Sequence, residues 1–277
     1  MSNSNLPEIL VPTDFSEVGK CALEHALKIA SVIDGQVTLL HVVGKEKEVA
    51  SKETQVEEKA KEAAKRTGIT VKGMVSVGNI FDDIGGIASK IKAQFIFMGT
   101  HGAKGLQKVT GSYALRVITN SEVPFVVVQK KGPAAHGYSK LVLPLDLTKE
   151  SVQQMRFAAA IAKHFNSEIH ILGEKHGDSG LRAKVKSNIV VAYRYLKNEG
   201  VNAVAEIAKG SKSFDKEVLA YAEGVGADLI SIVNVQDSIL SMFGGFEQNI
   251  IANPKEIPAL VVNPRVTTKT GGFLLGQ

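Results

Sequence analysis

The chain has 277 residues, of which 44% are hydrophobic and 22% are charged, so it can bury a sizeable core and is not intrinsically disordered. Its single cysteine, Cys21, excludes an intramolecular disulfide and a thiolate metal cluster, and a lone thiol is typical of a reducing compartment. The formal net charge of +5 is compatible with anionic partners, but lysines are mixed with glutamates along predicted helices such as 45–66, which favours a solvated surface over nucleic-acid binding.

The N-terminal segment lacks the pattern of a secretory signal, and no apolar run is long enough to span a bilayer. We therefore expect a cytoplasmic protein that binds neither membranes nor nucleic acid. Cys21 falls inside a predicted helix, where we expect it to be a small buried or half-buried hydrophobic residue.

Short apolar runs alternate with longer helical patterns along the first half of the chain. Strands are predicted at Glu8–Val11, Gln36–Val42, Thr70–Ser76, Phe95–Met98 and Pro124–Val128. Helices are predicted between them at Val18–Ile33, Lys47–Thr67 and Asn79–Lys92. This alternation is typical of βαβ units, and therefore of a parallel sheet covered by helices on both faces.

The second half repeats the first. The segment Leu141–Asp146 matches Ile9–Asp14 at an offset of 132, and Ile257–Val262 matches Val123–Val128 at an offset of 134. Between the copies lies 130–137, a polar segment with Gly, Pro and Ala that is predicted to be a linker. We interpret the pattern as a tandem duplication.

The duplication predicts two domains, 1–131 and 138–265, followed by a tail at 266–277. Strands of the second copy are predicted at Lys140–Leu143, Glu168–Leu172, Asn202–Ile207, Leu229–Val233 and Ala259–Val262. Its helices are predicted at Ser151–Phe165, Asp178–Glu199 and Ser213–Gly224.

A glycine-rich segment follows the fourth predicted strand. It reads Gly99-Thr100-His101-Gly102-Ala103-Lys104-Gly105 and is closed by Gly111-Ser112. Glycine lets the backbone approach a ligand closely, and a helix that begins there presents N–H groups to anions. Such a turn holds phosphate at the carboxyl edge of many parallel sheets, although glycines after strands also serve simply as turns.

Taken in order, these motifs resemble the universal stress protein family in its tandem two-domain form. The resemblance is carried by Val11-Pro12-Thr13-Asp14, Leu40-His41-Val42-Val43, Val77-Gly78-Asn79, Gly99-Thr100-His101-Gly102, Gly111-Ser112 and Val123-Pro124-Phe125-Val126. It implies an α/β fold of two tandem, doubly wound, five-stranded parallel sheets of order 3-2-1-4-5, Rossmann-like and similar to the adenine nucleotide alpha hydrolases. It also implies that the two halves pair through their fifth strands, with further homodimerisation possible.

The resemblance further implies a site for ATP or a related adenine nucleotide in the first domain, alone or with Mg²⁺. Asp14 would accept hydrogen bonds from adenosine, Pro12 and Thr13 would form the floor, and the backbone of Val42 and Val43 would border the adenine. The residues implied near the ribose and phosphates are Gly99, Gly102, Lys104, Gly105, Gly111, Ser112 and Tyr113. In nucleotide-binding members nine residues separate the second glycine from Gly-Ser, whereas here eight do, 103–110.

Several of these residues have a structural alternative. Asp14 and Ser16 could cap the following helix, and His41 is expected to be a hydrogen-bonded turn histidine rather than a base. In the second half Asp146 and Gly210 persist, but Asn234-Val235-Gln236-Asp237-Ser238 replaces the glycine-rich turn and Glu247 stands near the position of Ser112. A carboxylate repels phosphate, so we expect no ATP there.

Two functions remain open at this point. The first is a cytoplasmic stress-response protein that binds ATP in its first domain without dedicated catalysis, with which slow hydrolysis is compatible. The sequence shows neither a metal-ligand cluster nor a P-loop, and His101 has no Ser or Asp at triad-like positions. The alternative is a nucleotide-independent, dimeric protein-interaction module.

Overall fold

The structure is a computed structural model that describes residues 6–100, 117–119, 121–234 and 245–264. The first half contributes β1 (Glu8–Pro12), β2 (Gln36–Val43), β3 (Val71–Val77), β4 (Ala93–Gly99) and β5 (Phe125–Val128). The second half contributes β6 (Lys140–Leu145), β7 (Glu168–Gly173), β8 (Asn202–Ile207), β9 (Leu229–Val233) and β10 (Ala259–Val262).

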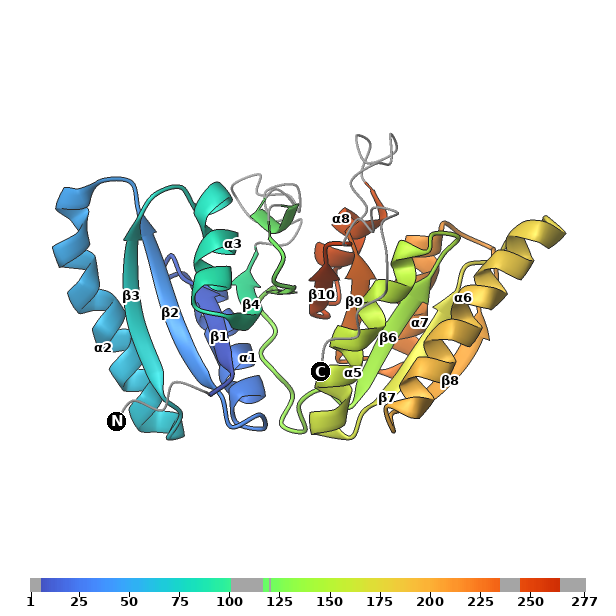
Figure 1. The fold of residues 1–277 in the computed structure, drawn as a ribbon, viewed down its shortest axis with the longest axis horizontal. Coiled ribbons are helices and arrows are strands. Elements are labelled where there is room, and N and C mark those ends of the chain that lie inside the picture. Colours follow the sequence, from blue (N-terminus) through green and yellow to red (C-terminus); the bar gives the residue numbers. More distant parts are fainter. Residues whose placement is uncertain (1–5, 101–116, 120, 235–244, 265–277) are drawn as a thin grey trace, which may run out of the picture.

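All ten strands form one sheet, in the order β3-β2-β1-β4-β5-β10-β9-β6-β7-β8 (Figure 1). Within each half every neighbouring pair of strands is parallel. Each half therefore has the 3-2-1-4-5 order, and the predicted fold of two tandem, doubly wound sheets is confirmed.

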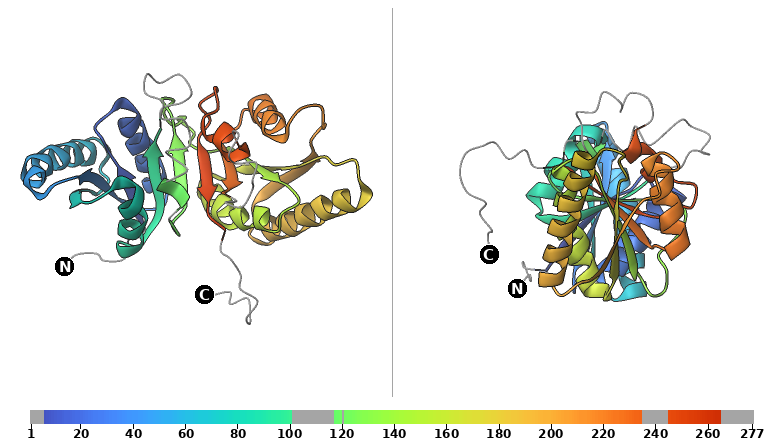
Figure 2. Two further views of the ribbon diagram at one scale, coloured as in Figure 1. Left: turned by 90° about the horizontal axis from the view of Figure 1, so that it is seen from above. Right: turned by 90° about the vertical axis from the view of Figure 1, so that its right-hand side faces the viewer.

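Helices cover both faces of the sheet (Figure 2). One face carries α1 (Glu17–Ala30), α2 (Val49–Thr67), α5 (Met155–Phe165) and α6 (Ser179–Asn198), which share a core cluster with every second strand residue. The other face carries α3 (Ile80–Lys90), α7 (Phe214–Val225) and α8 (Phe246–Ile251) over a second cluster. The apolar strands are thus buried from both sides, which is why they read as continuous hydrophobic runs.

Two local predictions need correction. The helix predicted at Ser151–Phe165 begins as a 3-10 helix, η2 (Glu150–Gln154), and becomes α-helical only at Met155. Helix α8 was not predicted, because six residues are too few to show helical periodicity. A short 3-10 turn, η1 (Glu46–Glu48), also precedes α2. The strand boundaries shift by two residues at most.

The two halves meet where β5 and β10 run antiparallel, with Val127 opposite Ala259 and Phe125 opposite Val261. This is the internal pairing of fifth strands that the resemblance implies. Side-chain amides from both halves stabilise this strand pairing. The Gln129 amide donates to the carbonyl of Asn253 at 2.8 Å, and the Asn263 amide donates to the carbonyl of Ser121 at 2.7 Å.

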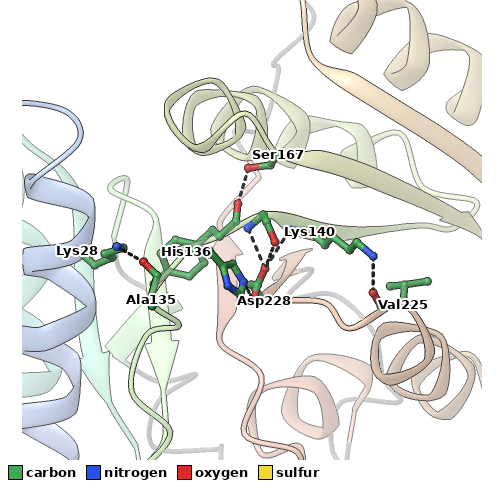
Figure 3. Close-up of polar contacts among 9 residues, drawn as sticks. Lys28, Ala135, His136, Lys140, Ser167, Val225 and Asp228 are labelled. Carbon is green, nitrogen blue, oxygen red and sulfur yellow. Dashed lines mark hydrogen bonds and ion pairs between the residues drawn. The ribbon is translucent and has the colours of Figure 1, made fainter.

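The segment predicted to be a linker is held by hydrogen bonds along its length. On the side of the first half, its Lys131 carbonyl accepts from the Cys21 thiol at 3.2 Å and lies 2.9 Å from His25 Nε2, while Lys28 Nζ donates to the Ala135 carbonyl at 2.6 Å. On the side of the second half, Nε2 of its His136 lies 3.1 Å from Asp228 Oδ1 (Figure 3). The linker is therefore an ordered connection, and Cys21 is buried as expected.

Candidate functional site

The candidate site lies where the strand order reverses, between β1 and β4. Strand β2, which follows β1 in the chain, lies on one side of β1, and β4 lies on its other side. Loops diverge at such a switch point, which leaves a crevice beyond the carboxyl ends of the strands where ligands of open α/β sheets bind. Pro12 ends β1 and Gly99 ends β4, so the fold brings these two predicted site residues to the same edge.

The turn after β1 caps helix α1. The Asp14 carboxylate accepts from the backbone N–H of Ser16 at 2.9 Å and from its hydroxyl at 2.5 Å. Ser16 is the N-cap residue, and its hydroxyl oxygen accepts from Gly19 N–H at 3.2 Å. The capping alternative for Asp14 and Ser16 is thus confirmed. Ser16 is the N-cap residue, and Asp14 fixes the position of Ser16. Asp14 is nevertheless exposed to solvent.

The end of β2 is joined to this turn. His41 Nδ1 lies 2.7 Å from the carbonyl oxygen of Thr13, and its ring centroid lies 4.6 Å from that of Phe15. His41 is therefore hydrogen-bonded as expected, although it lies within β2 rather than in a turn. The Val43 carbonyl accepts from Gly78 N–H at 2.9 Å, so backbone bonds fix the two residues predicted to border the adenine, Val42 and Val43.

Gly99 has a packing role that the sequence did not reveal. A Cβ atom at this position would lie 2.4 Å from the carbonyl oxygen of Val18 in the first turn of α1. Only glycine therefore allows α1 to begin directly against the end of β4. At the matching position of the second half, offset by 134, stands Val233, and there the covering helix begins as η2 instead. We attribute that difference to the bulk of the valine.

Thr100 follows Gly99 and is only 4% exposed. Its N–H donates to the Val128 carbonyl at 2.8 Å, which fixes its backbone. Its hydroxyl is buried and has no hydrogen-bond partner within the described part of the chain. A buried hydroxyl without a partner costs free energy, so such a group at the switch point is a candidate ligand contact. The sequence motif contained Thr100 but gave no reason to single it out.

The matching edge of the second half is closed by its own side chains. Asn234, offset by 134 from Thr100, donates from its amide to Asn263 Oδ1 at 2.9 Å. The Asn188 amide of α6 donates to the carbonyls of Asp146 and Thr148, both at 2.9 Å. The turn after the first strand keeps the same cap, since the Asp146 carboxylate accepts from the backbone N–H of Thr148 at 2.8 Å. The two edges therefore differ in the Asn188 contacts, in the residue that ends the fourth strand and in the residue after it.

The remaining predicted site residues lie outside the described residues: Gly102, Lys104, Gly105, Gly111, Ser112 and Tyr113. A cavity of about 460 Å³ reaches Thr13 and Gly19 but runs down the groove between α1 and α2, and neither Asp14 nor Gly99 lines it. Among the described residues, no three His, Cys, Asp or Glu side chains are grouped so as to hold a metal ion. None of the described helices combines the length and apolar character that crossing a membrane requires.

The fold defines a duplicated, doubly wound α/β protein, and the candidate site lies at the switch point of its first half. The model of the universal stress protein family matches residues 6–129. Universal stress protein MJ0531 of Methanocaldococcus jannaschii is 33% identical in an alignment of 139 residues that covers 44% of this chain and 82% of that protein. Universal stress protein MJ0577 of the same organism is 30% identical in an alignment of 154 residues that covers 45% of this chain and 95% of that protein. The chain belongs to the universal stress protein family.

A solved structure shows the same architecture over both halves. The crystal structure of a universal stress protein from Archaeoglobus fulgidus DSM 4304 matches with a TM-score of 0.70, covering 95% of this chain and 99% of that chain. At 19% sequence identity this likeness supports the fold alone.

Proposed function

We propose that the protein is a stress-response protein that binds ATP at the switch point of its first half and has no dedicated catalytic machinery. Asp14 would contact the adenosine from the turn after β1, and the backbone of Val42 and Val43 would border the adenine. The glycine-rich segment after Thr100 would surround the phosphates, with Lys104 as countercharge. We further propose that the chain divides into two domains, 1–131 and 138–265, of which only the first binds the nucleotide.

The observation that carries this proposal is the contrast between Thr100 and Asn234. One half leaves a buried hydroxyl at the carboxyl end of its fourth strand without a partner among the described residues. The other half fills the matching position with an amide that is hydrogen-bonded to Asn263. A ligand that satisfies the Thr100 hydroxyl would explain why the first half tolerates the cost of burying it.

Calorimetric titration of the purified, nucleotide-stripped protein with ATP tests the proposal. Thr100→Val keeps the shape of the side chain and removes the hydroxyl. We expect it to weaken ATP binding by about 3- to 10-fold, the value of one hydrogen bond, without lowering the stability of the free protein. Ser231→Ala is the matched control, because Ser231 is another fully buried hydroxyl without a partner among the described residues, in the second half.

Gly111→Val extends the test to the phosphate end. It should abolish ATP binding by occluding the glycine-rich segment, whereas Gly245→Val in the second half should leave the affinity unchanged. Absence of ATP binding at millimolar concentration, or full affinity in the Gly111→Val protein, would overturn the proposal.

A second function is supported by the packing roles found above. Asp14 holds the cap of α1, and Gly99 permits the contact between α1 and β4, so both residues have a structural reason without any ligand. This favours the nucleotide-independent interaction module as the alternative. Absence of ATP binding by the wild-type protein at millimolar concentration, together with a gain in stability in Thr100→Val, is the result that this alternative predicts.

A further inference from the structure

Helix α6 lies at the outer end of the molecule, next to the edge strand β8 (Figure 1). One side of α6 is fixed to the second half, because Val185, Ala192 and Leu196 are buried there. Its N-terminus is capped by Asp178, whose carboxylate accepts from Leu181 N–H at 2.9 Å. The opposite side is a solvent-facing surface on a rigid support.

The charge on α6 is of one sign only. The helix carries five cations and no acid: Arg182, Lys184, Lys186, Arg194 and Lys197. No carboxylate of the described residues lies within ion-pair distance of any of them. The two acids nearest in sequence have partners of their own, since Asp178 caps the helix and Glu199 pairs with Lys163.

The corresponding helix of the first half, α2, shows what a simply solvated surface looks like in this protein. It also carries five cations, but four glutamates accompany them. Lys59 pairs with Glu62, and Lys61 pairs with Glu57, at 2.9 and 3.2 Å. The two corresponding helices therefore differ in charge, because α6 has the cations without the acids.

Helix α6 also exposes large hydrophobic side chains, which α2 does not. Four of its large hydrophobic side chains are substantially exposed: Leu181 (39%), Val190 (44%), Val191 (46%) and Tyr193 (41%). No large hydrophobic side chain of α2 is exposed to this degree. Single exposed hydrophobic residues are normal, and Leu181 and Val191 point to other sides of the helix. Val190 and Tyr193 are three residues apart and therefore lie on one side of α6.

The spacing of the exposed residues is that of a helix-packing seam. Ala183, Lys186, Val190, Tyr193 and Lys197 are all exposed and follow one another at intervals of 3, 4, 3 and 4 residues. Residues at these intervals form a stripe along one side of an α-helix, as in a coiled coil. We call this stripe the α6 seam. Its centre is apolar, and lysines lie on either side of that centre.

We propose that the α6 seam docks an acidic amphipathic helix of a partner protein. The partner's apolar side chains would pack on Val190 and Tyr193, while its carboxylates would pair with Lys186, Lys197 and Arg194. The simplest alternative partner is the α6 helix of a second copy. Charge excludes it, because the five cations of one helix would face the five cations of the other. A bilayer is less suited, since the seam offers no Trp, Phe or Leu for insertion. A nucleic acid would place phosphates over the valine and tyrosine.

Fluorescence anisotropy with the full-length protein tests this proposal. The probe is a labelled helical peptide with leucines at heptad positions a and d and glutamates on its flanks. The comparison peptide has the same composition with the leucines moved out of register. We expect the first to bind about tenfold more tightly, because only it presents an apolar stripe together with the carboxylates.

Two variants locate the binding. Val190→Ser combined with Tyr193→Ser should lower the affinity for the in-register peptide about tenfold and remove its preference over the comparison peptide. Lys59→Glu combined with Lys61→Glu on α2 makes a matched surface change and should leave the affinity unchanged. Equal binding of both peptides, or no effect of the α6 variant, would overturn the proposal. Tighter binding of phosphatidylglycerol vesicles or duplex DNA than of the in-register peptide would likewise overturn it, in favour of that class of partner.

Discussion

His25 lies in the core of the first half, where both ring nitrogens have a partner. Nδ1 is 2.6 Å from the Tyr138 hydroxyl oxygen and Nε2 is 2.9 Å from the Lys131 carbonyl oxygen. The two contacts fit a neutral ring that donates from Nε2 and accepts the Tyr138 proton at Nδ1. Burial is the main cause that lowers the pKa of His25 below its ordinary value of 6.5. In its neutral form, His25 thus links α1 to the linker and to the second half by hydrogen bonds.

This arrangement predicts an acid-sensitive stability. Because the pKa of His25 is lower in the folded than in the unfolded protein, the unfolded state binds the proton more readily. The stabilisation by neutral His25 is therefore fully present above pH 6.5. It is lost as the pH falls below 6.5, by up to about 1.4 kcal/mol per pH unit. Urea unfolding between pH 8 and 5 should show a smaller loss in His25→Gln than in the wild-type protein.

The control is His164→Gln, which changes an exposed histidine of α5 and should retain the wild-type pH dependence. A His25→Gln protein that loses as much stability on acidification as the wild type would contradict the prediction. Cys21 shares the Lys131 carbonyl, and burial raises the pKa of its thiol to about 11, so it should stay neutral across this range.

At the scale of the elements, Gly99 decides how helix α1 begins. A methyl group there would meet the backbone of Val18 rather than the end of a flexible side chain, so the helix itself would have to move. We expect Gly99→Ala to lower the free energy of unfolding by about 1–3 kcal/mol. Gly44→Ala is the control, since a Cβ atom at Gly44 meets nothing within 4 Å. Thermal and urea unfolding measure the stability of both variants. Equal stability would show that the packing of α1 against β4 accommodates a methyl group at Gly99.

The elements also show where sequence reasoning succeeds. Strands buried on both faces, such as Leu229–Val233 and Ala259–Val262, stand out as apolar runs and were predicted with their observed bounds. The role of Asp14 and Ser16 as a cap follows from local chemistry and was foreseen as an alternative. The 3-10 start of the helix after β6 was not, because Val233, the residue to which we attribute it, lies about 80 residues further along the chain.

The candidate site, too, was predicted from the sequence only in part. Of the predicted site residues, Pro12 and Gly99 end neighbouring strands at the same edge of the sheet, while most of the glycine-rich motif lies outside the described residues. Sequence alone could not show that Gly99 is needed for packing, or that the hydroxyl of Thr100 is buried without a partner among the described residues. Both are tertiary facts, set by which atoms the fold brings within 4 Å of these residues.

At the scale of the whole molecule, two amides hold the halves together. Gln129 follows β5 and Asn263 follows β10, at the offset of 134 that relates the two copies. Each donates to two backbone carbonyls of the other half, Gln129 to Ile251 and Asn253, and Asn263 to Ile118 and Ser121. The pairing of β5 with β10 is short, so these reciprocal bonds should contribute much of the coupling between the halves.

We therefore expect the double variant Gln129→Ala, Asn263→Ala to uncouple the halves. It leaves buried carbonyls without donors, at a cost of about 1–3 kcal/mol for each site. Hydrogen exchange at the amides of β5 and β10 should accelerate before that of β2 or β7, because the contact between the halves would open first. Gln94→Ala changes an exposed glutamine of β4 and should leave exchange unaltered. If β5 and β10 keep wild-type protection in the double variant, then strand pairing and apolar packing alone join the halves, and the amides are dispensable.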